Sequence, residues 1–131
     1  MMNEPSCARS SGPTVLVLGG TGFVGRALVK RLLHDGLRLR ALVRETSGPA
    51  EWLAAQGVEL VKGGIADTAS VEAALDGIRH VYHLARATGP AWADYLRLDI
   101  EPTRRLAELC CVRGIALYYI SSMRGSVACF R

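Results

Sequence analysis

Several features that mark common protein classes are scarce or missing in this chain of 131 residues. No apolar run approaches the roughly 20 residues that a membrane-spanning helix needs, and the polar N-terminal stretch lacks the apolar centre of a secretory signal. The four cysteines match neither a CxxC metal pattern nor a disulfide framework, so we expect free thiols in a reducing compartment. These absences predict a cytoplasmic protein without a membrane partner or a bound metal.

Lysine is also scarce, with Lys30 and Lys62 as its only occurrences. The net charge is +4, but the basic residues are scattered along the chain rather than clustered. They are not interleaved with aromatic residues, as a single-stranded nucleic-acid site requires. We therefore expect no nucleic-acid partner, although one or two of these charges could serve a phosphate-bearing ligand.

Short apolar runs and helical periodicities alternate along residues 14–122, which we interpret as one domain between a flexible tail (1–13) and a divergent tail (123–131). In a helix that begins near Val24 and stops at Gly36, Val24 and Leu32 fall on one apolar face. Pro102 is expected to interrupt or kink the last helical stretch. Short links between strands and helices indicate an α/β fold with a doubly wound parallel sheet of order 3-2-1-4-5. The predicted strands are 14–18, 39–43, 58–61, 81–84 and 115–120, and the helices are 24–35, 50–56, 67–76 and 92–113.

A glycine-rich turn joins the first predicted strand to the first predicted helix. Gly19 permits a sharp turn, Gly22 lets the backbone approach a diphosphate, and Gly25 lets the helix pack closely. The N-terminus of the following helix offers free N–H groups and a partial positive charge to phosphates. No Gly-Lys-Ser/Thr follows, which disfavours a P-loop for nucleoside triphosphates. The turn therefore predicts a dinucleotide-binding site.

Four motifs along the chain resemble the extended branch of the short-chain dehydrogenase/reductase superfamily, which contains NAD(P)-dependent epimerases, dehydratases and reductases. The stretch 17–25 is similar to its glycine signature, and Tyr82-His83-Leu84-Ala85 resembles its "HLA" motif. Asp99-Ile100-Glu101-Pro102-Thr103 stands where the branch usually has Asn-Val-x-Gly-Thr, and Tyr119-Ile120-Ser121-Ser122 resembles its fifth-strand end. The resemblance extends from Thr14 to about Ser122.

This resemblance implies a set of site residues. Ser122 matches the serine that hydrogen-bonds the reacting oxygen of the substrate. Gly64 stands where the family usually has an Asp that holds adenine, while Ile65 could still pack on that ring and Asp67 caps the next helix. His83 lines the cleft and receives no catalytic role. The implied cofactor contacts are Gly19, Thr21, Gly22, Phe23, Val24, Gly25, Arg44, Gly64, Ile65, Leu84, Ala85 and Asp99.

The end of the second strand bears on the choice of cofactor. NAD-dependent proteins tend to place an acid there to hold the ribose hydroxyls, whereas an arginine accommodates the 2′-phosphate of NADP. Val43 occupies the expected acid position and Arg44 follows it, so the sequence favours NADP(H) over NAD(H). The alternative is that Arg44 is simply an exposed residue at the end of a strand.

The chain lacks the Tyr-x-x-x-Lys pair on which catalysis in this family depends. From position 123 the sequence departs from the family pattern, as a fragment, a truncated gene or a frame-shifted one would. We therefore expect the fifth strand to be an open sheet edge, with self-association through it. A non-catalytic nucleotide-binding sensor and a methyltransferase are the competing functions, and the downstream motifs disfavour the methyltransferase.

Overall fold

The computed structural model describes residues 12–46, 48–85, 91–120 and 127–130. Its centre is one sheet with the order β3-β2-β1-β4-β5-β6. The first five strands are parallel, which confirms the predicted doubly wound order. The strands are β1 (Val15–Leu18), β2 (Leu39–Val43), β3 (Glu59–Lys62), β4 (His80–His83), β5 (Ala116–Ile120) and β6 (Val127–Phe130).

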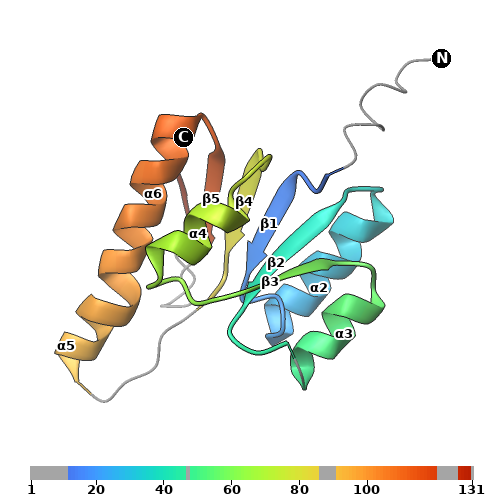
Figure 1. Cartoon of the computed structure of the whole chain (residues 1–131), viewed down its shortest axis with the longest axis horizontal. Helices are drawn as coiled ribbons and strands as arrows, with labels where there is room; N and C mark the ends of the chain where they lie inside the picture. Colours follow the sequence, from blue (N-terminus) through green and yellow to red (C-terminus); the bar gives the residue numbers. More distant parts are fainter. Residues whose placement is uncertain (1–11, 47, 86–90, 121–126, 131) are drawn as a thin grey trace.

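Helices cover both faces of this sheet, with α2 and α3 on one side and α4 and α6 on the other (Figure 1). Strand β1 shows why. Val15 and Val17 pack toward α2 and α3, whereas Leu16 and Leu18 pack toward α4 and α6, because successive side chains of a strand point to opposite faces. The helical elements are α2 (Phe23–His34), α3 (Pro49–Ala55), α4 (Thr68–Ala74), α5 (Trp92–Tyr95), the π-helical segment η1 (Leu96–Ile100) and α6 (Glu101–Arg113).

The predicted helix over 92–113 is divided into three parts at the place where Pro102 was expected to disturb it. Pro102 occupies the first turn of α6, where its missing N–H leaves no helical bond unmade. Within a continuous α-helix its ring would meet the carbonyl of Leu98, so the preceding turn widens into the π-helical segment η1. The widened turn lies directly beside the cleft described below.

The expectation that the fifth strand is an open edge is wrong. Strand β6 pairs antiparallel with β5, and the register runs from Leu117 opposite Phe130 to Ile120 opposite Val127. This pairing occupies the N–H and C=O groups that an edge strand leaves open. Part of the segment predicted as a divergent tail is therefore a strand. Self-association stays a prediction, but it can no longer be argued from an open edge at β5.

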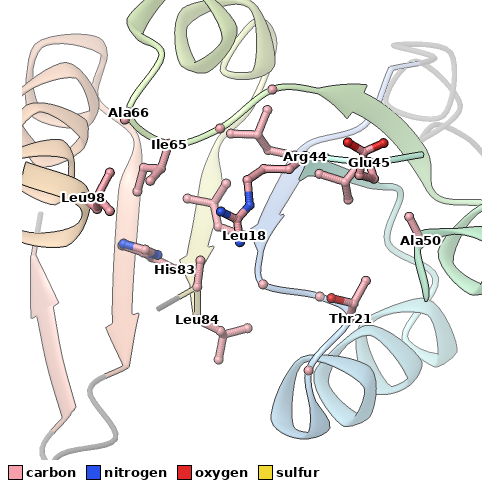
Figure 2. A pocket seen from close by; sticks show the side chains of 18 of the residues that line it. Leu18, Thr21, Arg44, Glu45, Ala50, Ile65, Ala66, His83, Leu84 and Leu98 are labelled. Carbon is pink, nitrogen blue, oxygen red and sulfur yellow. The ribbon is translucent and has the colours of Figure 1, made fainter. Parts of the chain in front are cut away.

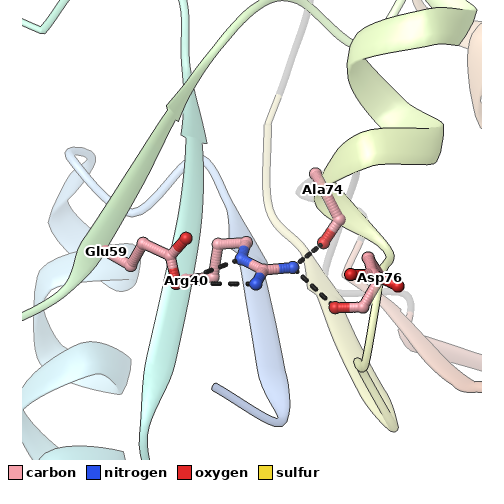
Figure 3. A network of polar contacts seen from close by, with 4 residues as sticks. All are labelled: Arg40, Glu59, Ala74 and Asp76. Carbon is pink, nitrogen blue, oxygen red and sulfur yellow. Dashed lines mark hydrogen bonds and ion pairs between the residues drawn. The ribbon is translucent and has the colours of Figure 1, made fainter. Parts of the chain in front are cut away.

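Arg40 on β2 has a structural role, although the sequence placed it only among scattered basic residues. One guanidinium nitrogen, Nη1, donates to the carbonyl of Ala74, the last residue of α4, at 2.8 Å and to that of Asp76 at 2.7 Å (Figure 3). Its Nε lies 3.5 Å from the carboxylate of Glu59 on the neighbouring strand β3. Arg40 thus satisfies carbonyls that a helix C-terminus leaves without partners. It lies near the amino end of β2, away from the cleft.

Candidate functional site

An open cleft of about 760 Å³ lies at the carboxyl ends of β1, β2, β3 and β4. Strand β1 separates β2 from β4, so this is the point where the order of the sheet reverses and ligands bind in doubly wound folds. Phe23, Val24 and Gly25 do not line the cleft. The predicted cofactor contacts that do line it are Gly19, Thr21, Gly22, Arg44, Gly64, Ile65, Leu84, Ala85 and Asp99.

The turn between β1 and α2 leaves no space for side chains at two of its glycines. Gly19 has a φ of +85°, and a Cβ there would lie 2.6 Å from the backbone nitrogen of Ala85. A Cβ on Gly25 would collide with the carbonyl oxygen of Gly19 and lie 2.8 Å from Cα of Gly20. Gly19 therefore provides the sharp turn, as predicted, and Gly25 brings α2 against the backbone of the turn itself.

Gly22 directly precedes α2 and differs from these two glycines. Its backbone is extended, and a Cβ there would have only the carbonyl of Gly19 nearby, at 3.6 Å. No side chain caps the N-terminus of α2, and its first turn contains no acidic residue. The N–H groups and the positive end of the helix dipole are thus left to a ligand on the side where Gly22 borders the cleft.

Phe23 and Val24, two of the predicted cofactor contacts, are the first residues of α2 and lie on the surface. Their side chains are 93% and 54% exposed. The buried stripe of α2 consists instead of Gly25, Val29 and Leu32, at the spacing i, i+4 and i+7. The apolar face assigned from sequence to Val24 is therefore rotated from the face that the helix buries, because the close approach at Gly25 sets the orientation of the helix.

Arg44 follows β2 directly, and its side chain extends into the cleft (Figure 2). Among the described residues that line the cleft, it is the only arginine or lysine. Val43, at the position expected for an acid, is a core residue that packs against α2 and α3. Glu45 lies one position further and also lines the cleft, so one positive and one negative residue border the cleft at this strand end.

Asp67 was predicted to cap a helix rather than to hold a ligand. It occupies the N-cap position of α4, but its side chain forms no capping hydrogen bond there. It precedes α4 and does not line the cleft. Its carboxylate accepts a 2.7 Å hydrogen bond from the hydroxyl of Ser70. This hydrogen bond lowers the pKa of Asp67, because it favours the charged carboxylate.

Buried polar side chains form the opposite side of the cleft. His83 at the end of β4 is 1% exposed, and its Nε2 lies 2.9 Å from the hydroxyl of Thr103 on α6. The Thr103 hydroxyl donates to the carboxylate of Asp99 at 3.4 Å, so it accepts from Nε2–H of His83. The three side chains connect β4 to η1 and α6, and all three line the cleft.

Burial keeps the His83 imidazole neutral. Loss of solvent lowers the pKa of His83 to about 4, and the nearby charge of Asp99 opposes this shift only in part. The second ring nitrogen, Nδ1, is buried and has no hydrogen-bond partner among the described residues. A proton on Nδ1 would therefore be a buried donor without an acceptor, which is costly. His83 lines the cleft as predicted, and its environment favours the neutral form.

Ser122, the predicted catalytic residue, lies outside the described residues. Sequence reasoning missed Glu45 and Thr103, although each has a signal: Glu45 adjoins Arg44, and Thr103 follows Asp99 at the helical spacing i, i+4. In the described parts of the chain, no helix is long and apolar enough to cross a membrane, and no cluster of three potential metal ligands occurs.

A doubly wound sheet with a glycine turn at its switch point defines a Rossmann-type dinucleotide-binding protein. Residues 15–128 match the model of the NAD dependent epimerase/dehydratase family, and the chain belongs to that family. This match extends beyond Ser122, where the resemblance was expected to end.

Individual proteins that are similar to this chain support this family membership. Sterol demethylase protein B from Methylococcus capsulatus is 40% identical over 117 residues, which cover 87% of this chain and 35% of that protein. Among solved structures, a short-chain dehydrogenase/reductase superfamily protein from Agrobacterium tumefaciens with bound NAD is 30% identical, with a TM-score of 0.67 over 83% of this chain and 32% of its own. UDP-glucose 4-epimerase from Thermus thermophilus in complex with NAD is 28% identical, with a TM-score of 0.65 over 79% of this chain and 36% of its own. The chain thus spans about a third of the length of each.

Proposed function

We propose that the cleft binds a nicotinamide adenine dinucleotide, with NADP(H) preferred over NAD(H). The chain would then be the cofactor-binding portion of an extended short-chain oxidoreductase, epimerase or dehydratase. The glycine turn is the observation that carries this proposal. At Gly19 and Gly25 a single added carbon would collide with backbone, so the turn holds its shape only with glycine, and a shape of this kind suits a diphosphate.

The proposal gives each side of the cleft a role. N–H groups at the start of α2 bind the diphosphate, and Gly22 permits its close approach. Ile65 packs on the adenine, while Leu84, Ala85 and Asp99 border the nicotinamide half of the cleft. The bound cofactor supplies hydride transfer. His83, as a neutral side chain hydrogen-bonded to Thr103, holds that wall of the cleft in place without exchanging a proton.

The preference for NADP(H) rests on Arg44. A guanidinium can form a charge-assisted fork with a 2′-phosphate, and Arg44 is the only arginine or lysine among the described residues of the cleft wall. Glu45 opposes this preference, because a carboxylate repels a phosphate and can bind ribose hydroxyls instead. We expect Arg44 to prevail, since its side chain extends toward the middle of the cleft (Figure 2).

A second candidate is a sensor that binds the dinucleotide without turning over a substrate. The missing Tyr-x-x-x-Lys pair favours it for this polypeptide, since the family's acid or base and its lysine partner are both absent from the sequence. Both candidates predict cofactor binding, and neither predicts turnover by this chain alone. A protein whose remaining part supplied the pair would be the enzyme.

Calorimetric titration of the chain with NADPH, NADH and S-adenosylmethionine tests the proposal. We expect one NADPH per chain, roughly tenfold weaker binding of NADH, and no heat with S-adenosylmethionine. The Arg44→Asp variant should reverse the preference, and Glu45→Gln should strengthen NADPH binding. Arg38→Asp is the matched control, because Arg38 is exposed and precedes β2 at the other end of that strand. Equal affinity for NADPH and NADH in both the parent chain and Arg44→Asp would remove the preference from the proposal.

A further inference from the structure

Strand β6 lies at one edge of the sheet in the described part of the chain. It pairs with β5, and no other described strand pairs with its second edge. In an antiparallel pair the backbone groups of successive residues alternate in direction, so every second residue of β6 directs its N–H and C=O away from β5. Val127–Phe130 therefore presents backbone donors and acceptors to which a further strand could bind.

The two edges of the sheet differ in charge. Strand β3, at the opposite edge, reads Glu59-Leu60-Val61-Lys62 and has a charged residue at each end. Charges of this kind protect an edge strand, because they disfavour the approach of another strand. Strand β6 reads Val-Ala-Cys-Phe and contains no charged residue, proline or glycine. The edge at β6 thus lacks the residues with which proteins commonly block strand pairing.

A mostly apolar groove of about 280 Å³ lies beside this edge, between α6 and β5. Its lining includes Ala107 and Cys111 on α6, together with Ile115 and Leu117. Leu117 is the residue of β5 that pairs with Phe130 of β6. Among the described residues, none from α4 or β4 lines the groove. The groove therefore lies on the flank of α6 that faces β6 rather than on the flank that faces α4.

We propose that β6 is a dimerisation edge, which pairs antiparallel with β6 of a second copy of this chain. A two-fold axis perpendicular to the sheet relates two such strands, so each copy supplies the backbone partners that the other requires. The same axis places both α6 helices on one face of the joined sheet, with the two grooves facing each other across the seam. One symmetry operation thus covers the edge and the groove of both copies, whereas one added peptide strand would extend the sheet without a second helix beside the groove.

The seam is short, with four residues from each strand, so we expect a weak dimer. Its dissociation constant should be on the order of 10–100 μM. Sedimentation velocity of the full chain, from about 1 μM to about 500 μM, measures this association. A reducing agent is present throughout, because the exposed Cys111 could otherwise link two copies covalently. No dinucleotide is present, so a failure of the proposed cofactor binding would not change the result.

Ala128→Lys should weaken the dimer at least about tenfold, because the two-fold axis brings two lysines to the same short seam. Position 128 is suited to this test because its register partner Tyr119 is only half-buried, whereas Leu117, the partner of Phe130, is buried. Ala128→Glu should weaken the dimer similarly. An equimolar mixture of the two variants should associate within about threefold of the parent, since opposite charges then meet. Ala54→Lys is the matched control, because Ala54 is exposed on α3, and it should leave the dimer unchanged.

Amide hydrogen exchange, followed by NMR at a low and a high concentration, locates the contact. The amides of β6 that point to β5 should be protected at both concentrations. The alternate amides of β6 should gain protection only at the high concentration, where the dimer forms. The amides of β3 should exchange equally at both. Circular dichroism melting of each variant reports whether it folds.

Four results would overturn the proposal. One is a chain that stays monomeric over the whole range, and another is a dimer whose alternate β6 amides stay unprotected. A third is protection of the alternate amides at every concentration in a monomer, which would mean that the edge is already paired within one chain. The fourth is a dimer that a folded Ala128→Lys variant leaves unchanged, or a loss in both folded variants that their mixture does not recover.

Discussion

On the side of the β1–α2 turn the cleft is lined by glycine backbone, whereas on the side of β4 and α6 it is lined by buried side chains that hydrogen-bond to one another. The shape of the first side depends on the absence of side chains at Gly19 and Gly25. The shape of the second depends on the hydrogen bonds that join His83, Thr103 and Asp99. Stability and binding on the first side should therefore be lost when an atom is added to a glycine. On the second side, stability should be lost when His83 is protonated or the Thr103 hydroxyl is removed.

Among variants on the side lined by glycine backbone, Gly25→Ala should have the largest effect. The added methyl group would collide with the carbonyl of Gly19, and backbone cannot move aside as a flexible side chain can. We expect a loss of about 3 kcal/mol or more in the free energy of unfolding, measured by urea denaturation, together with loss of dinucleotide binding.

Gly22→Ala is the matched variant on the same turn. Its φ is −77°, and its Cβ would approach only the carbonyl of Gly19, at 3.6 Å. The free energy of unfolding should change by less than about 1 kcal/mol, while NADPH affinity falls because the methyl group stands where a diphosphate would approach. Similar instability in the two variants would show that the turn is sensitive everywhere rather than at its close contacts.

Lowering the pH tests the side-chain side. The folded-state pKa of His83 is about 4 and its ordinary value is 6.5, so between these values the unfolded chain binds a proton that the folded chain does not. The contribution of His83 is therefore complete above pH 6.5 and falls by about 3 kcal/mol as the pH decreases toward 4. Urea denaturation across this range should show the free energy of unfolding falling with pH, and His83→Asn should remove most of this pH dependence. An unchanged pH dependence in that variant would assign it to other groups.

Arg40→Met tests whether stability and binding can be separated. It removes the hydrogen bonds to the carbonyls of Ala74 and Asp76 while keeping an apolar stem of similar length. We expect a loss of about 2 kcal/mol in the free energy of unfolding. Calorimetry at a temperature where the variant is folded should find NADPH affinity unchanged, because Arg40 lies at the other end of β2 from Arg44. A tenfold weaker affinity would mean that the two ends of the sheet are coupled.

Thr103→Val should cost less stability than Gly25→Ala, protonation of His83 or Arg40→Met. It is nearly isosteric and removes only the hydroxyl, which leaves Nε2 of His83 without its partner. The expected cost is about 1 kcal/mol, and Thr103→Ser, which keeps the hydroxyl, should lose less stability than Thr103→Val. Because serine keeps the hydroxyl and lacks the methyl group, a larger loss in Thr103→Ser than in Thr103→Val would assign the stability to packing of the methyl group rather than to the hydrogen bond.

The same contrast explains what the sequence could predict. Apolar runs such as Val15–Leu18 mark strands buried on both faces, and the glycine spacing marks a turn whose geometry is local, so the strand order and the turn were predictable. The pairing of β6 with β5 was not, because its four residues lie after position 123, where sequence reasoning recognised none of the family's motifs. The roles of Thr103 and Arg40 also escaped prediction, since each depends on a partner far away in sequence: His83 for the first and the end of α4 for the second.

The central claim is that the cleft binds the dinucleotide through the β1–α2 turn and Arg44. The most direct measurement is a titration of the ¹⁵N-labelled chain with NADPH, followed by amide chemical shifts. The largest changes are expected at Gly19–Gly25, Arg44 and Gly64, with Ala116–Ile120 much less affected and with smaller changes at Arg44 when NADH replaces NADPH. Saturable shifts confined to residues away from the β1–α2 turn, or no shifts at millimolar NADPH, would contradict it.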